Sequence, residues 1–216
     1  MADIKYIGHS AFEIRTGEKS ILIDPYVSAN PKYNWHEPNI TDIFITHGHV
    51  DHIGEAIEIA KEKDALITAV YEVANYCEKH GCRVRGVNLG GWLDYDWGKV
   101  VFLPAFHSST LPDGAYGGCA ASILLDIEGI RIYHAGDTAL SGEMKIIKEL
   151  YRPNVAMLPV GGTYTMDVEH AAIAADWLGA QTVIPMHYLP ETDLKRFQDL
   201  IHAGNKACAI LNQDQV

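Results

Sequence analysis

The stretch that decides the fold of this chain reads Thr46-His47-Gly48-His49-Val50-Asp51-His52. It brings three imidazoles and a carboxylate together directly after the apolar run 43–45, which reads as a buried strand. His47 and His49 lie two residues apart on an extended backbone, so their side chains point to the same side and can share a cation. Asp51 and His52 follow where the chain must turn, and they can face a second cation. The stretch therefore predicts a metal-binding loop held by a strand.

Three more polar residues follow apolar strands farther along the chain, namely His107, Asp137 and His187. The carboxyl ends of parallel strands meet at one edge of a sheet, where α/β proteins gather their chemistry. Any one of these residues alone would indicate little, because a lone histidine is more often structural. Together with the His47 cluster they make four polar strand ends, which packing alone does not explain. Imidazole and carboxylate ligands suit zinc, and also iron and manganese.

Length and composition predict one globular domain spanning residues 1–216, with 48% hydrophobic and 21% charged residues. The net charge of −11 argues against a long nucleic-acid footprint, since phosphate binding relies on Lys and Arg. No apolar run is long enough to cross a bilayer and the N-terminus lacks a signal pattern, so we expect a cytoplasmic protein without membrane contact. The cysteines, which show no C-x-x-C spacing, are expected to be buried, reduced thiols: Cys77, Cys82, Cys119 and Cys208.

Hydrophobic periodicity predicts strands that alternate with helices. The expected strands are 4–7, 11–15, 20–23, 43–45, 66–70, 92–97, 98–106, 120–127, 130–133, 155–158, 182–184 and 207–211. The expected helices are 55–63, 72–80, 144–151, 168–178 and 194–203. Both halves of the chain begin with strands and then alternate strands with helices, which predicts two related α/β halves packed sheet against sheet. The segment 25–41, rich in proline and aromatic residues, is expected to be an ordered loop that either borders a site or runs over the surface.

The chain resembles the metallo-β-lactamase superfamily, whose hallmark is H-x-H-x-D-H followed by a later His, an Asp and a final His. The resemblance implies an α/β fold of four αββα layers, with two mixed sheets packed face to face and helices outside. It also implies that His47, His49 and His107 hold one metal ion, and that Asp51, His52 and His187 hold a second. Asp137 would bridge the two ions.

Three phrases are most similar to a branch of small metal-dependent hydrolases near the ascorbate-6-phosphate lactonases: Tyr6-Ile7-Gly8-His9-Ser10, Gly136-Asp137-Thr138 and Pro185-Met186-His187-Tyr188. An aspartate at position 137, rather than a cysteine, differs from the β-lactam-cleaving members. A histidine at position 49, rather than a glutamate, differs from the oxygen-reducing di-iron members. The resemblance thus implies two divalent metal ions, with Zn²⁺ as the first choice and Mn²⁺, Fe²⁺ or Ni²⁺ as ions that the same ligands accept.

The expected function is metal-dependent hydrolysis of an ester, lactone or phosphodiester bond in a small, potentially anionic molecule. Water activated by two metal ions would attack the carbonyl carbon or phosphorus, and Asp51, Asp137 and His187 are the expected catalytic residues. Two alternatives stay open, a nuclease or phosphodiesterase that acts on nucleic acid and a non-catalytic metal-binding protein. Assembly into a homo-oligomer also stays open.

Five further residues are candidates for supporting the ligands or contacting substrate. Asp24 either orients a ligand histidine or simply ends its strand. His9 either lines the site or is a buried, hydrogen-bonded histidine. His134, three residues before Asp137, either supports the ligands or is turned into the core by the alternation of its strand. His170 at a helix start, and Tyr188 beside a predicted ligand, are candidates for substrate contact, although exposed residues of these types are often only solvated.

Overall fold

The computed structural model describes residues 2–211, which divide into two compact units. The first unit comprises the chain up to Gly91 together with Ser108–Ala121. The second comprises Trp92–His107 and Ser122–Ile210. That the whole chain acts as one domain stays a prediction.

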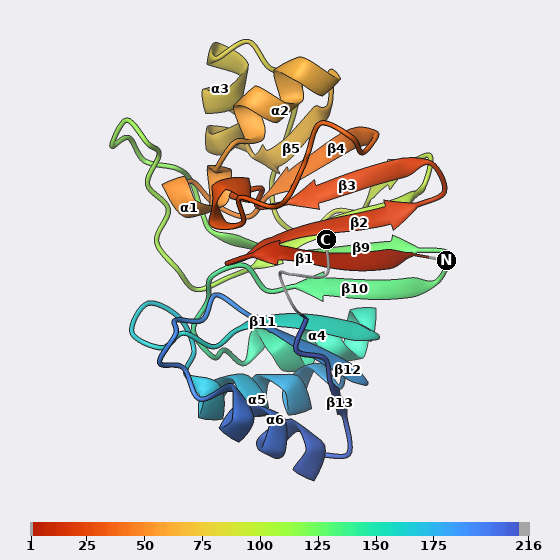
Figure 1. Cartoon of the computed structure of the whole chain (residues 1–216), viewed down its shortest axis with the longest axis vertical. Helices are drawn as coiled ribbons and strands as arrows, with labels where there is room; N and C mark the ends of the chain where they lie inside the picture. Colours follow the sequence, from red (N-terminus) through yellow and green to blue (C-terminus); the bar gives the residue numbers. More distant parts are fainter. Residues whose placement is uncertain (1, 212–216) are drawn as a thin grey trace. The chain divides into compact units, whose positions relative to one another are not determined.

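The first unit contains a six-stranded mixed sheet in the order β1-β2-β3-β4-β5-β6. Its strands are β1 (Asp3–Gly8), β2 (Ala11–Thr16), β3 (Lys19–Ile23), β4 (Ile40–Ile45), β5 (Leu66–Val70) and β6 (Val84–Val87). Its helices are η1 (Val27–Ala29), α1 (Val50–Ile53), α2 (Ala56–Lys63) and α3 (Tyr71–Lys79). The β1–β3 strands are antiparallel, whereas β3–β6 are parallel. The α2 helix packs on β4 and β5, and α3 packs on β5 and β6 (Figure 1).

The second unit contains a seven-stranded mixed sheet in the order β13-β12-β11-β10-β9-β8-β7. Its strands are β7 (Leu93–Tyr95), β8 (Gly98–Pro104), β9 (Ala121–Ile127), β10 (Ile130–His134), β11 (Val155–Pro159), β12 (Thr182–Met186) and β13 (Ala207–Cys208). Its helices are α4 (Glu143–Tyr151), α5 (Val168–Leu178) and α6 (Leu194–Ala203). Strands β10 to β13 run parallel, so β10, β11 and β12 end at the same edge.

The bounds of α5 follow directly from its sequence signals. Asp167 caps the first turn by accepting a hydrogen bond from the backbone N–H of His170, and Gly179 ends the helix in the left-handed conformation. The residues at spacings of three and four positions form its buried face: Ala171, Ala174, Ala175 and Leu178. Within residues 2–211, the helices are all too short or too polar to span a bilayer.

The structure corrects the sequence predictions at four points. The four residues Val50–Ile53 form α1, a helix that the sequence did not predict, and the predicted strand 207–211 is only Ala207–Cys208. The latter lies at the edge of its sheet, where only these two residues pair with β12. Cys119 is exposed and Cys208 is half-buried, whereas Cys77 and Cys82 are buried as expected. The strand β6 (Val84–Val87) was also missed, because its short sequence contains arginine and glycine and lacks a strong apolar pattern.

A buried carboxylate network stabilises the strands of the first unit away from the predicted ligands. Glu13 on β2 is fully buried and accepts hydrogen bonds from the Arg15 guanidinium at 2.7 and 3.1 Å. The hydroxyls of Ser20 and Tyr33 donate to the same carboxylate at 2.7 and 3.1 Å. Burial alone raises the pKa of Glu13, but these donors and the positive charge of Arg15 lower it more, so the pKa lies below its ordinary value.

This network predicts a pH-dependent contribution to stability. A carboxyl whose pKa is lower in the folded than in the unfolded protein stabilises the fold above the unfolded pKa, and that stability is lost as the pH falls through the folded pKa. We expect Glu13→Gln to lower the free energy of unfolding at pH 7 by about 1.5–3 kcal/mol, the typical value of hydrogen bonds to a charged group. The difference from wild type should shrink as the pH falls below about 4.3, the ordinary pKa of a glutamate.

Denaturant unfolding of metal-free protein at pH 7 and at a pH below about 4.3, followed by circular dichroism, measures the difference in unfolding free energy between wild type and variant. The matched control is Glu37→Gln, which removes the same charge from an exposed side chain. If Glu13→Gln and Glu37→Gln lose equal stability at pH 7, the assigned role of the network is wrong.

Candidate metal centre

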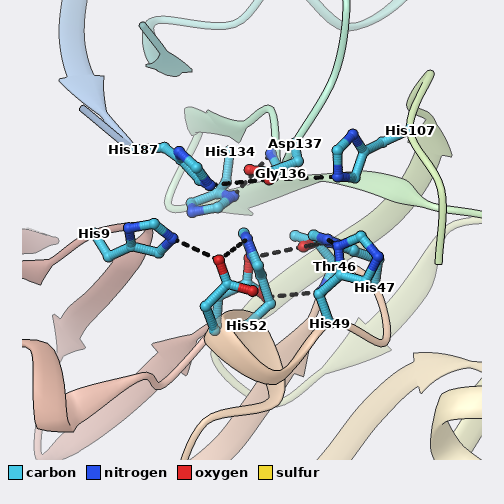
Figure 2. A network of polar contacts seen from close by, with 12 residues as sticks. His9, Thr46, His47, His49, His52, His107, His134, Gly136, Asp137 and His187 are labelled. Carbon is cyan, nitrogen blue, oxygen red and sulfur yellow. Dashed lines mark hydrogen bonds and ion pairs between the residues drawn. The ribbon is translucent and has the colours of Figure 1, made fainter. Parts of the chain in front are cut away.

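The first-unit ligand loop begins where β4 ends at Ile45. His47 is fully buried and His49 is half-buried. Figure 2 shows the two side chains next to each other; their rings are edge-on, with Nε2 of His47 3.0 Å from Nδ1 of His49. His52 lies on α1, and its ring centroid is 4.1 Å from that of His47. The spacing of the motif and the turn into α1 thus gather the three imidazoles around one point of the first unit.

Asp24 at the end of β3 organises these imidazoles. Its fully buried carboxylate accepts hydrogen bonds from the Thr46 backbone N–H at 2.8 Å and from the Thr46 hydroxyl at 2.7 Å. It also lies 2.7 Å from Nδ1 of His52. Because a carboxylate accepts, His52 donates its Nδ1–H and directs the lone pair of Nε2 the other way. The Thr46 hydroxyl donates to Asp24, so it accepts from Nδ1 of His47 at 3.0 Å, and Nε2 of His47 likewise carries the lone pair.

Asp51 adds a carboxylate to this cluster. Its Oδ2 lies 2.9 Å from Nε2 of His9 and 3.9 Å from Nε2 of His52. Burial alone raises the pKa of Asp51, but the hydrogen bond from His9 and the attraction of His52 and His9 lower it well below its ordinary range. Asp51 is therefore held as an ionised acceptor among imidazoles.

Ser109 holds the ligand loop in a way that the sequence did not indicate. Its hydroxyl accepts a hydrogen bond from the backbone N–H of Gly48 and donates to the carbonyl of Gly117, each at 3.0 Å. A side chain at Gly48 would crowd Ser109 and Leu111, so only glycine fits this approach without adjustment. The only available signal was the position of Ser109 two residues after the predicted ligand His107, which is too weak to assign a role.

In the second unit the three predicted ligands meet, although they come from different strands. Figure 2 shows Asp137 between His107 and His187. Oδ2 of Asp137 lies 3.0 Å from Nε2 of His187 and 3.6 Å from Nε2 of His107. Asp137 is 3% exposed. The prediction that strand-end residues gather therefore holds for these three side chains.

Neighbouring groups position these three candidate ligands of the second unit. The fully buried His134 ends β10 and accepts, at Nδ1, a hydrogen bond of 3.1 Å from the backbone N–H of Gly136, which fixes the turn into Asp137. Gly161 lies so close to the carbonyl of His187 that a side chain there would collide with it. The Thr138 hydroxyl accepts from the backbone N–H of Phe106 at 3.0 Å, which connects the His107 and Asp137 segments.

The separations between these side chains suit pairs of ligands that share a divalent metal ion. Two ligands on a tetrahedral zinc ion at about 2.05 Å are about 3.3 Å apart. The separations between His47 and His49, and between Asp137 and its two histidines, range from 3.0 to 3.6 Å. In the first unit the second ring nitrogens of His47 and His52 are engaged with a hydroxyl and a carboxylate, as is usual for metal-binding imidazoles.

Three candidate site residues have an uncommon backbone conformation. His9, Asp24 and His187 have φ angles of 54°, 47° and 49°. Such left-handed conformations are uncommon outside glycine, and they persist only where the surroundings impose them. Each of the three residues directly follows the last residue of a strand, and its backbone conformation turns the chain away from the sheet.

The remaining candidates lie in less constrained places. His170 is exposed, and its Nδ1 lies 3.1 Å from the helix-capping carboxylate of Asp167. Tyr188 is half-buried directly after His187. Substrate contact by either residue stays a prediction.

Comparison with known proteins agrees with this description. The β-lactamase superfamily domain matches residues 3–187. A UPF0173 metal-dependent hydrolase from Geobacillus thermodenitrificans is 44% identical over 86% of this chain and 84% of its own length. Igni18, a metallo hydrolase from Ignicoccus hospitalis, has a TM-score of 0.88 and 34% identity, covering 98% of this chain and 95% of its own.

A third similarity concerns the fold alone. The metallo-β-lactamase fold protein YhfI from Bacillus subtilis is 13% identical, with a TM-score of 0.76 over 98% of this chain and 97% of its own. The α/β class and the two mixed sheets predicted from the sequence are thereby confirmed. With its superfamily match and its relatives named as metal-dependent hydrolases, the chain belongs to the metallo-β-lactamase superfamily.

Proposed function

We propose that this chain hydrolyses an ester, lactone or phosphodiester bond in a small molecule with the help of two divalent metal ions, Zn²⁺ first among them. One observation carries the proposal. In this member of the superfamily, imidazole and carboxylate groups lie at strand ends, at separations that suit metal ligands. The relative from Geobacillus thermodenitrificans is named a metal-dependent hydrolase, which supports the same reaction class.

The proposed ligands are divided as the superfamily pattern implies. His47, His49 and His107 would hold one ion, and Asp51, His52 and His187 the other. Asp137 would contact both. Bound metal ions lower the pKa of water towards neutrality and stabilise developing negative charge on oxygen.

The side chains then have distinct tasks. Asp51 would orient the attacking water and accept a proton from it as the water oxygen bonds to the carbonyl carbon or phosphorus. The bond to the leaving oxygen breaks, and that oxygen takes up a proton. Asp24 keeps His52 in the tautomer that presents Nε2, and Thr46 does the same for His47. Asp137, almost fully buried between two imidazoles, places its carboxylate where cationic charge is best compensated.

Metal removal tests the function. We expect protein purified without added metal to contain about two divalent ions per chain, as in two-metal hydrolases. Dialysis against dipicolinate should abolish turnover of p-nitrophenyl acetate, a γ-lactone or bis(p-nitrophenyl) phosphate, and zinc or manganese chloride should restore it. Elemental analysis and initial rates measure both.

Two results would contradict this proposal. Metal binding without turnover across the whole panel would favour a non-catalytic metal-binding protein. Turnover restricted to RNA or DNA, with binding that weakens as salt rises, would favour a nuclease.

Loss of the Asp137 carboxylate should lower both metal occupancy and rate. We expect Asp137→Ala to retain less than two ions and to lose more than about 100-fold in kcat/KM, because a ligand should matter at least as much as its outer-shell partners. The matched control Asp199→Ala removes an exposed carboxylate from α6. Full occupancy in Asp137→Ala, measured by elemental analysis, would exclude the bridging role.

Asp24 should act through the imidazole that it orients. We expect Asp24→Asn to weaken zinc affinity about 10–100-fold, because outer-shell partners of metal-binding histidines have effects of this size. Competition with a chromophoric chelator gives the affinity, and a thermal melt checks that the variant folds. A folded Asp24→Asn with wild-type zinc affinity would show that Asp24 only ends its strand.

A further inference from the structure

Asp51 lies on an element too short to fix its own side chain. The α1 helix has four residues, and so short a helix has little stability apart from its tertiary contacts. Its first-turn carboxylate is 36% exposed, in contrast to the fully buried His52 of the same helix. A partner from outside α1 is therefore needed to hold the Asp51 carboxylate in one orientation.

His9 is that outside partner. It lies in the turn between β1 and β2, separated from Asp51 by 42 residues, and its Nε2 approaches Oδ2 of Asp51 to 2.9 Å. In Figure 2 its ring points towards the α1 residues of the first unit. The distance fits a hydrogen bond from imidazole N–H to carboxylate.

Contacts other than the one with Asp51 also hold His9 in place. The hydroxyl of Tyr6 donates to the His9 carbonyl at 3.0 Å, and the His9 backbone has a φ of 54°. The ring stands edge-on to Tyr26 and His52, with centroid distances of 5.9 and 5.7 Å. A residue held in a rare backbone conformation by several partners is often functional.

We propose that His9 is a positioning residue that holds the carboxylate of Asp51 in the orientation needed for metal binding and proton acceptance. This inference rests on the proposed function and adds to it a residue outside the seven-ligand pattern. The β1–β2 turn would thereby set the orientation of the Asp51 side chain on α1. His9 contributes a hydrogen bond to Asp51 and no bond to metal.

Three variants separate the side chain from the backbone. His9→Phe keeps an aromatic ring but loses the N–H, whereas His9→Gln can still donate a hydrogen bond to Asp51. His9→Asn suits the positive φ but is too short to reach Asp51. The matched control His36→Phe removes an exposed histidine of the same unit, which pairs with Glu62.

Zinc affinity is measured first, by titration of metal-free protein with zinc chloride against a chromophoric chelator. We expect His9→Phe and His9→Asn to raise the zinc Kd about 10-fold or more, as for other groups that orient ligands, and His9→Gln to restore most of the affinity. With whichever ester, lactone or phosphodiester probe the wild type turns over, kcat should fall in His9→Phe while KM changes little. His36→Phe should match the wild type, and thermal melts identify any variant that fails to fold.

Two results would overturn the assignment. Wild-type zinc affinity and kcat in a folded His9→Phe would show that His9 does not position Asp51. Loss of one imidazole from the zinc shell of His9→Phe, counted by X-ray absorption spectroscopy, would make His9 a ligand. Failure of the proposed function looks different, because the wild type itself would then bind no metal or hydrolyse no probe.

Discussion

The buried carboxylate of Asp24 is the interaction on which the first-unit site depends. It collects three hydrogen bonds, two from Thr46 and one from His52, in a place without access to water. In such a low-dielectric setting these bonds are strong, and losing one partner would leave a buried polar group unsatisfied. The same network therefore fixes the turn after β4, the start of the ligand loop and the tautomers of two imidazoles.

The second unit reaches a comparable result with a different device. Asp137 sits between His107 and His187, which follow β8 and β12. Three strands separate β8 from β12 in the sheet, and hydrogen bonds of the Phe106 backbone to Thr138 and Ala139 hold the His107 segment beside Asp137. Sheet strands are rigid supports, so side chains at their ends keep their separations. The left-handed backbone of His187 and the close approach of Gly161 then aim the histidine away from its strand. In both units a rigid strand end is followed by a constrained turn that presents the proposed ligands.

Particular elements show how far the sequence alone could lead. The bounds of α5 and α6 agree with the predicted ranges 168–178 and 194–203, because caps and apolar periodicity are local signals. By contrast two of the four residues of α1 are proposed ligands, and their polar pattern hides a helix. Ser109 was missed because its partners, Gly48 and Gly117, approach it only in the folded chain. The exposure of Cys119 likewise depends on its surroundings rather than on its residue type.

The sequence by itself determined the fold class, the superfamily and the residue types of the seven proposed ligands, because motif spacing and strand periodicity are written into consecutive residues. Tertiary structure decided which groups support them. The contact of His9 with Asp51, the hydrogen bonds to Asp24 and the approach of His107 and His187 to Asp137 join residues 22 to 50 positions apart in the sequence. Such contacts depend on the order of strands in a sheet and on the conformations of turns. Patterns in neighbouring residues do not determine which distant residues meet.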